Sequence, residues 1–217
     1  MQPLSGSQME ALETAVQSYQ DQLTLPAAQY LHHRGISREV ATTFRLGCVT
    51  DPIPGHGRYR GMLAIPYLDR DGHPLTVRFR CLQEHDHRAN GHGKYNSMKD
   101  DPSRVYNIKA IFDAKDEIHI TEGEFDTMIL TKIGLPAVAI PGAHGWQYHH
   151  RRMLAGFSRV FVWADPDDAG AEFMTKVMAS MRTARGVSLK VGDVSETYMQ
   201  GGADALLALI NREVKHL

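Results

Sequence analysis

The sequence predicts an α/β protein, α+β overall, whose second half forms a mostly parallel sheet flanked by helices. Two apolar segments of strand length, 118–121 and 159–164, are rich in β-branched residues and end in carboxylates and a glycine. Each is followed by a helical pattern. A third short apolar segment, 137–140, lies between them. Strands separated by single helices favour a parallel sheet with right-handed crossovers. The first half lacks this alternation, so we divide the chain into residues 1–112 and 113–217.

Residues 1–112 begin with a pattern typical of three short helices. Residues 8–23 carry apolar side chains at helical spacing. Pro26 favours the start of a second helix, which Gly35 ends. Ser37 is a suitable N-cap for a third helix. We therefore expect a small helical region before the first strands.

A β-hairpin is expected after these helices. Two strand-like segments, 62–67 and 75–81, are joined by Asp-Arg-Asp-Gly at 69–72, which is typical turn chemistry. Residues 1–112 thus form a small mixed helical and hairpin subdomain. In the second half we expect helices over 147–155, 167–183 and 203–215, and a fourth strand over 187–191.

Composition places the chain among ordinary globular proteins. It has 217 residues, of which 42% are hydrophobic and 23% charged, enough to bury a sizeable core. We see no apolar run of membrane-spanning length and no signal-peptide pattern at the N-terminus, so no membrane association is expected. Cys48 and Cys81 are far apart and form no Cys-x-x-Cys, which favours buried, reduced thiols in the cytoplasm.

Two acidic clusters follow the strands at 118–121 and 159–164. The first contains Glu122, and the second contains Asp165 and Asp167. The carboxyl ends of parallel strands meet at one edge of a sheet, where ligands bind. Carboxylates brought together there repel one another unless a cation lies between them, and Mg²⁺ prefers such oxygen ligands. The alternative for either cluster alone is an acidic loop that caps helices.

A modest basic excess precedes the acidic clusters. Residues 1–112 contain 13 Lys and Arg against 11 Asp and Glu, whereas 113–217 contain 11 against 14. A basic region beside an acidic metal site suits a polyanion such as nucleic acid. An ordinary solvated surface is the alternative, because the excess is small.

The polar loop at 83–93 contains His85, His87 and His92, which raises the possibility of zinc. Their spacing matches no closed structural zinc site, and catalytic metal sites usually lie on rigid elements. We therefore expect a solvated loop here and no zinc.

Several motifs carry a resemblance to known families. Glu122-Gly123 after one strand, then Asp165-x-Asp167-x-x-Gly170 after a later one, resembles the Toprim domain of topoisomerases, primases and some nucleases. The segments 30–37, 44–47 and 58–66, then Arg80 and Lys94-Tyr95-Asn96-Ser97, are similar to the catalytic core of DnaG-type primases. The resemblance extends from about residue 30 to the end of the chain.

The resemblance implies a set of site residues and partners. The implied catalytic and metal-binding residues are Glu122, Asp165 and Asp167, joined at the metal by Asp193; nucleotide or template contacts come from Arg60, Arg80, Lys94, Tyr95, Asn96 and Lys99; structural positions are Gly123, Asp126, Gly142 and Gly170. Around Asp193 the family's proline and middle aspartate are missing. The implied cofactor is Mg²⁺, with Mn²⁺ as a substitute. The implied partners are single-stranded DNA, ribonucleoside triphosphates, and a separate replicative helicase and zinc-binding module.

The resemblance therefore implies a primase core that makes short RNA primers in the cytoplasm, which is that of a host cell if a phage encodes the protein. This core is either a naturally reduced, phage-like primase or a part of a longer protein. A Toprim nuclease that cleaves phosphodiesters with the same ions is the alternative enzyme. A non-catalytic nucleic-acid-binding subunit of the replication machinery is the third possibility. Primer products, shortened DNA or binding without reaction distinguish the three.

Overall fold

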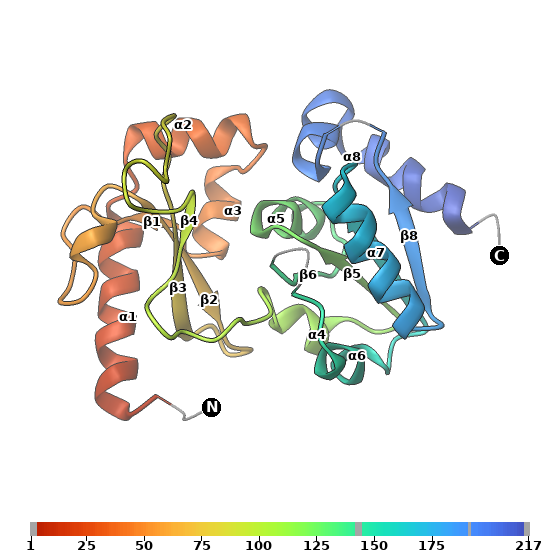
Figure 1. Cartoon of the computed structure of the whole chain (residues 1–217), viewed down its shortest axis with the longest axis horizontal. Coiled ribbons are helices and arrows are strands. Elements are labelled where there is room, and N and C mark those ends of the chain that lie inside the picture. The colour runs from red at the N-terminus through yellow and green to blue at the C-terminus, as the bar shows by residue number, and fades with distance from the viewer. Residues whose placement is uncertain (1–3, 142–144, 191, 215–217) are drawn as a thin grey trace. The chain divides into compact units, whose positions relative to one another are not determined.

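The chain folds as two compact units, Met1–Pro102 and Ser103–Leu217 (Figure 1). The computed structural model describes residues 4–141, 145–190 and 192–214, with side chains up to residue 211. It confirms the predicted mixed α/β class, with an antiparallel sheet in the first unit and a parallel sheet in the second. None of the helices in the described ranges combines the length and hydrophobicity that a membrane crossing requires.

The first unit contains a four-stranded antiparallel sheet in the order β1-β2-β3-β4. The strands are β1 (Gly47–Cys48), β2 (Leu63–Leu68), β3 (Pro74–Arg80) and β4 (Tyr95–Asn96). The predicted hairpin is the β2–β3 pair. Its turn forms because Asp69 Oδ1 accepts hydrogen bonds from the backbone N–H groups of Asp71 and His73, and Gly72 adopts a φ of 92°.

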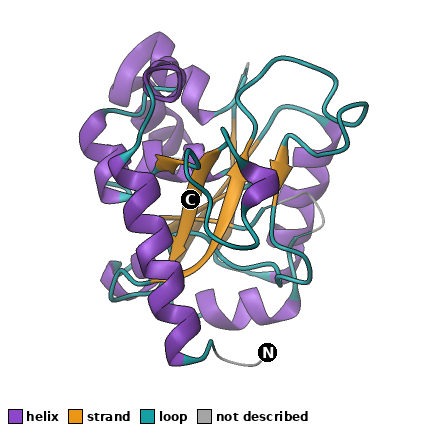
Figure 2. Cartoon of the chain, turned by 90° about the vertical axis from the view of Figure 1, so that its left-hand side faces the viewer, coloured by secondary structure: helices purple, strands orange, loops and turns teal. Residues whose placement is uncertain are grey.

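The three predicted helices of this unit are α1 (Gly6–Asp21), α2 (Leu25–His33) and α3 (Arg38–Thr43); a short 3₁₀ helix covers Gly57–Tyr59. Helix α1 begins two residues before the predicted start because Ser5 and Gln8 form a capping box. Ser37 caps α3 as predicted, accepting the Val40 N–H. Helix α1 packs against the sheet (Figure 2). Its buried Val16 and Tyr19 belong to the same hydrophobic cluster as Phe79 of β3.

The second unit contains a parallel sheet in the order β6-β5-β7-β8. The strands are β5 (Glu117–Thr121), β6 (Ala137–Ala139), β7 (Arg159–Ala164) and β8 (Ala184–Ser188). The helices are α4 (Lys109–Asp113), α5 (Glu124–Lys132), α6 (Tyr148–Leu154), α7 (Asp168–Ser180) and α8 (Val194–Val214). Strands and helices alternate as the sequence pattern predicts.

The core of this unit follows the alternation of side chains along the strands. Ile118 and Ile120 of β5 and Val160 and Val162 of β7 pack with residues of α4, α6 and α7, Phe173 among them. Helices α5 and α8 pack against each other, α5 also against β5 and β6, and α8 against β8. Helices therefore pack against both central strands of the sheet, β5 and β7.

One predicted boundary in the second unit is wrong. The fourth strand begins at Ala184 rather than Val187, because its backbone pairs with β7 through Arg185 and Gly186 despite their low hydrophobicity. The predicted helix over 203–215 is present as the second part of α8, directly after Gly202, whose non-helical φ of 65° interrupts α8. The first part of α8, which begins at Val194, was not predicted.

Gly47 permits a close approach between β1 and the end of α1. A Cβ atom at this position would lie 2.0 Å from the Tyr19 carbonyl oxygen and 2.4 Å from the Gln20 backbone nitrogen. Backbone atoms cannot move aside as a flexible side chain can. We expect Gly47→Ala to lower the free energy of unfolding by about 1–3 kcal/mol, the usual cost of overpacking.

Chemical denaturation of Gly47→Ala and Gly57→Ala would test this contact. Gly57 is the matched control in the same unit, since a Cβ there would meet nothing within 4 Å. Equal unfolding midpoints for the two variants would contradict the close packing of β1 on α1.

Candidate functional site

The acidic site is built by two adjacent parallel strands. Strand β5 ends at Thr121, so Glu122 follows it directly, and β7 ends at Ala164, so Asp165 follows it directly. The two strands are hydrogen-bonded in register, with Ile120 opposite Val162. Their carboxyl ends therefore deliver Glu122 and Asp165 to the same edge of the sheet.

Burial and the two neighbouring aspartates both act on the pKa of Glu122. Burial, and then the negative charges of Asp165 and Asp167, raise the pKa of Glu122 to about 7, while a backbone hydrogen bond from Asp165 acts in the opposite direction. Glu122 Oε1 is buried, with no hydrogen-bond partner among the described groups. A buried acceptor in this state is costly, and a bound cation would satisfy it.

Two glycines shape the backbone around these acids. Gly170 is buried against the end of β7, and a Cβ there would lie 2.2 Å from the Asp165 carbonyl oxygen. Asp167 is the N-cap of α7, and its Oδ1 accepts the Gly170 N–H at 2.7 Å. Gly123 is the N-cap of α5, and a Cβ there would lie 2.8 Å from Asp126 Oδ2. The motif spacing thus follows from the tight turns that join strand to helix.

The remaining acids of the predicted set lie at helix ends. Asp126 is buried in the first turn of α5, and its Oδ1 accepts the Ser195 N–H at 3.2 Å. Asp193 Oδ1 accepts the Glu196 N–H at 2.7 Å, which makes Asp193 the cap at the start of α8. Its role at a metal stays a prediction. Gly142, the remaining structural position, lies outside the described residues.

A group of basic and aromatic side chains gathers at one end of the first unit's sheet. We define this basic cluster as Tyr30, Arg34, Arg80, Lys94 and Tyr95. The Arg80 guanidinium, buried at the end of β3, lies 4.6 Å from the ring centroid of Tyr95 and 5.1 Å from that of Tyr30. The charge of Arg80, then burial, then the charge of Arg34 lower the pKa of Lys94. Cations held this close are suited to an anionic ligand such as a phosphate.

The other predicted contact residues of this unit have different settings. Arg60 is exposed after the 3₁₀ helix, and its guanidinium donates to the Thr50 carbonyl. Asn96 shapes the start of β4, since its side chain accepts the Gly93 N–H and donates to the Gly93 carbonyl. Lys99 is exposed in the loop that follows. Their roles in ligand binding stay predictions.

The histidine loop brings its potential metal ligands closer together than their spacing in the sequence indicates. His85, His87 and His92 lie together with Cys81, each offering one ligand atom, and these four atoms lie within 4.8 Å of one another. The sequence interpretation treated Cys81 only as a buried thiol and missed it as a member of this group. The signal was its position four residues before His85, directly at the end of β3.

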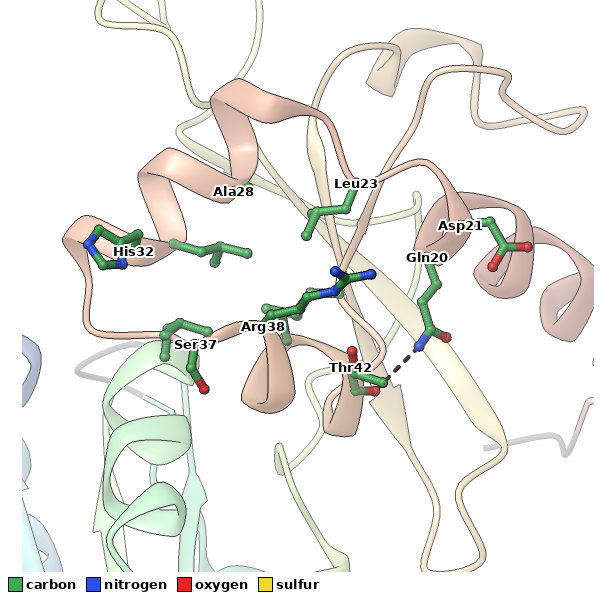
Figure 3. Close-up of a pocket in the computed structure, with 12 residues that line it drawn as sticks. Gln20, Asp21, Leu23, Ala28, His32, Ser37, Arg38 and Thr42 are labelled. Carbon is green, nitrogen blue, oxygen red and sulfur yellow. Dashed lines mark hydrogen bonds between the residues drawn. The ribbon is translucent and has the colours of Figure 1, made fainter.

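A pocket of about 650 Å³ lies among α1, α2 and α3 (Figure 3). Its lining includes Asp21, His32 and Arg38, and the Gln20 side chain donates to the Thr42 carbonyl across one wall. None of the predicted site residues lines it. The acidic site and the basic cluster are therefore the stronger functional candidates.

The acidic residues fit a hard divalent cation. All three side chains offer carboxylate oxygens, the ligands that Mg²⁺ prefers, and one of these oxygens, Glu122 Oε1, is buried without a hydrogen-bond partner in the described part of the chain. Glu122, Asp165 and Asp167 would hold the ion. Asp193 follows β8, the neighbour of β7, and so comes from the same region of the sheet.

Comparison with known proteins finds a matching family model, a related phage protein and solved structures of the same fold. A family described as Toprim-like matches residues 119–198. The gene 57 protein of Mycobacterium phage D29 is 36% identical over 157 residues, which cover 70% of this chain and 99% of that protein. Two solved structures share the fold at 20% identity and a TM-score of 0.78, each over 96% of this chain.

One is the zinc-binding and RNA polymerase domains of the Aquifex aeolicus primase, of which this chain spans 62%. The other is the RNA polymerase domain of Mycobacterium tuberculosis primase DnaG in complex with a double-stranded DNA oligomer carrying a 6-nucleotide overhang, of which it spans 81%. These likenesses show the fold of this chain.

The raised pKa of Glu122 predicts a pH-dependent penalty in the metal-free protein. A carboxyl group whose pKa rises on folding favours the folded state below its unfolded pKa of 4.5, and this contribution is lost as the pH rises toward 7. The full shift would correspond to about 3 kcal/mol, and solvent screening of this half-exposed group reduces it to about 1–2 kcal/mol. Glu122→Gln should therefore be more stable than the parent at about pH 8 and gain little at about pH 4.

Denaturation with and without Mg²⁺ would measure both effects, with the exposed Glu10→Gln as the matched control. Mg²⁺ should stabilise the parent protein and the control more than Glu122→Gln. An unchanged pH dependence in Glu122→Gln would contradict the raised pKa of Glu122.

Proposed function

The chain belongs to the family of the phage gene 57 protein and has the Toprim-containing fold of DnaG-type primase RNA polymerase domains, and on that premise we propose that it is the catalytic core of a DNA primase. The reaction is metal-dependent, template-directed synthesis of short RNA primers on single-stranded DNA. A 3′-hydroxyl attacks the α-phosphorus of a ribonucleoside triphosphate, and pyrophosphate leaves. The protein is thus a nucleotidyltransferase of the RNA polymerase type.

The convergence of Glu122 with Asp165 and Asp167 carries this proposal. Burial, together with the neighbouring charges of Asp165 and Asp167, raises the pKa of Glu122, and a cation bound among the three carboxylates would offset both effects. When bound there, Mg²⁺ or Mn²⁺ supplies charge neutralisation for the phosphates and acidifies the attacking hydroxyl. Glu122 is also the candidate acceptor for the proton of that hydroxyl, a role that the resemblance to DnaG-type primases implies.

The basic cluster supports synthesis over simple phosphodiester cleavage. The forked Arg80 guanidinium suits bidentate binding of a phosphate, and the exposed Lys94 ammonium offers a movable charge. Tyr95 presents an aromatic surface on which a template base could stack. A triphosphate and a template backbone together need more cations than a single scissile phosphate does.

The partners of the proposed reaction are single-stranded DNA and ribonucleoside triphosphates. A replicative helicase and a zinc-binding module that selects the initiation site are proposed as separate proteins, acting together with this chain in the cytoplasm. A Toprim nuclease is the competing function, and the products formed distinguish it from a primase.

Asp165→Ala should abolish primer synthesis while single-stranded DNA binding persists. Removing a metal-binding carboxylate should lower the rate by at least about a hundredfold, since even indirect ligand partners cost up to that much. The assay combines single-stranded DNA, Mg²⁺ and labelled ribonucleotides and resolves the products by length.

Asp168→Asn is the matched control, because this neighbouring acid is exposed in the first turn of α7 and is not assigned to the site. Shortened DNA in place of new primers would identify a nuclease. Full synthesis by Asp165→Ala would place the metal site elsewhere.

Lys94→Ala should weaken binding of single-stranded DNA and make it less sensitive to salt. Loss of one phosphate contact should reduce the slope of log K against log salt concentration by about 0.7. Fluorescence anisotropy across a salt series measures this slope. Arg70→Ala, an exposed cation in the β2–β3 turn, is the control with the same change in charge. An equal reduction of the slope in both variants would mean that DNA binding depends on the net charge of the protein alone.

A further inference from the structure

The loop between β3 and β4 contains four side chains that metals bind through sulfur and nitrogen. Cys81 directly follows β3, and His85, His87 and His92 lie on the loop itself. One ligand atom from each lies within 4.8 Å of the others, and Cys81 Sγ is 3.7 Å from His85 Nε2. A tetrahedral zinc site with ordinary Zn–N and Zn–S bonds places its ligand atoms about 3.3–3.7 Å apart. The loop is thus near that geometry.

The three imidazole rings surround a common point. Their centroids are 4.6 Å apart for His85 and His87, 5.0 Å for His85 and His92, and 5.4 Å for His87 and His92. A solvated polar loop would have no reason to bring three imidazoles and a thiol together. One thiol and three imidazoles prefer zinc and similar transition metals to Mg²⁺.

Two of the rings have a nitrogen environment that suits metal binding, one with a hydrogen bond and one without. His92 Nδ1 lies 2.9 Å from the Gly93 carbonyl, which can only accept, so Nδ1 carries the proton and Nε2 keeps its lone pair. Such a carbonyl partner is the usual support of a metal-binding histidine. His87 Nδ1 is buried with no hydrogen-bond partner among the described groups, a state that is costly unless a ligand satisfies it.

We propose that Cys81, His85, His87 and His92 bind a structural Zn²⁺ ion that fixes the loop between β3 and β4. Four protein ligands complete the tetrahedron and leave no open position, which indicates a structural site. Cys81 supplies the anionic ligand. This site is distinct from the acidic site in residues and in metal chemistry, and it does not depend on the proposed polymerase function.

The location of the ion gives it a function. Arg80 precedes the first ligand, and Lys94 comes two residues after the last, so the ion would close the loop that connects two of the three cations of the basic cluster. The Cys81 N–H also donates to the Lys94 carbonyl at 3.0 Å. Closing a flexible loop lowers the entropy that ligand binding would otherwise cost. The zinc would thus hold the basic cluster in a binding-competent arrangement.

Metal analysis of the full chain tests the proposal. The protein is purified without a polyhistidine tag, supplied with ZnCl₂, and passed over a desalting column in the presence of a weak chelator. We expect about one zinc per chain for the parent protein and less than about a tenth of that for Cys81→Ser and His87→Ala, because each loses one of four ligands. His73→Ala, an exposed histidine in the β2–β3 turn, should retain the ion.

Substitution with Co²⁺ gives a second readout. The parent protein should show the visible bands of tetrahedral cobalt and a thiolate-to-cobalt charge-transfer band, and Cys81→Ser should lose the latter. His87→Ala keeps the proposal testable if Cys81→Ser fails to fold. Absence of zinc from the parent protein, or equal retention by both variants, would overturn the proposal. The same measurements on Asp165→Ala separate this site from the acidic one, because that variant should still bind zinc.

Discussion

The in-register pairing of β5 with β7 is the constraint on which the acidic site depends. A carboxylate residue directly follows each strand. Because the strands are parallel neighbours, Glu122 and Asp165 share one edge of the sheet. The apolar packing of Ile118, Ile120, Val160 and Val162 holds this pairing against the repulsion of the charges above it. Hydrophobic burial in the sheet therefore keeps the carboxylates at one edge despite their mutual repulsion, and a bound cation would reduce that repulsion.

The elements with strong periodicity could be predicted from the sequence alone. Strand β7 and the β2–β3 hairpin follow from apolar segments bounded by turn residues, and α3 follows from the cap at Ser37. The start of β8 could not be predicted in this way, because Gly186 enters the sheet through backbone pairing with β7. Its missing side chain leaves room for Met174 of α7. Such tertiary contacts override local hydrophobicity.

The candidate sites also contain some residues that local sequence patterns predict and others that only the tertiary structure brings together. Glu122, Asp165 and Asp167 were found because a short motif fixes their place at strand ends. Cys81 was not recognised as a possible metal ligand because a short loop with irregular spacing has no comparable pattern. The sequence-based expectation of no zinc considered the three histidines alone. The group gains its fourth member only when the end of β3 places Cys81 beside the loop.

The hydrogen bond between Asp126 and Ser195 joins residues 69 positions apart in the chain. Asp126 lies in the first turn of the helix that starts next to Glu122, and Ser195 lies two residues after Asp193. The buried Asp126 carboxylate thereby connects the start of α8 to the start of α5. Because Glu122 and Asp193 each lie within four residues of one partner in this hydrogen bond, a shift of the start of either helix would strain the contact that joins the two helix starts.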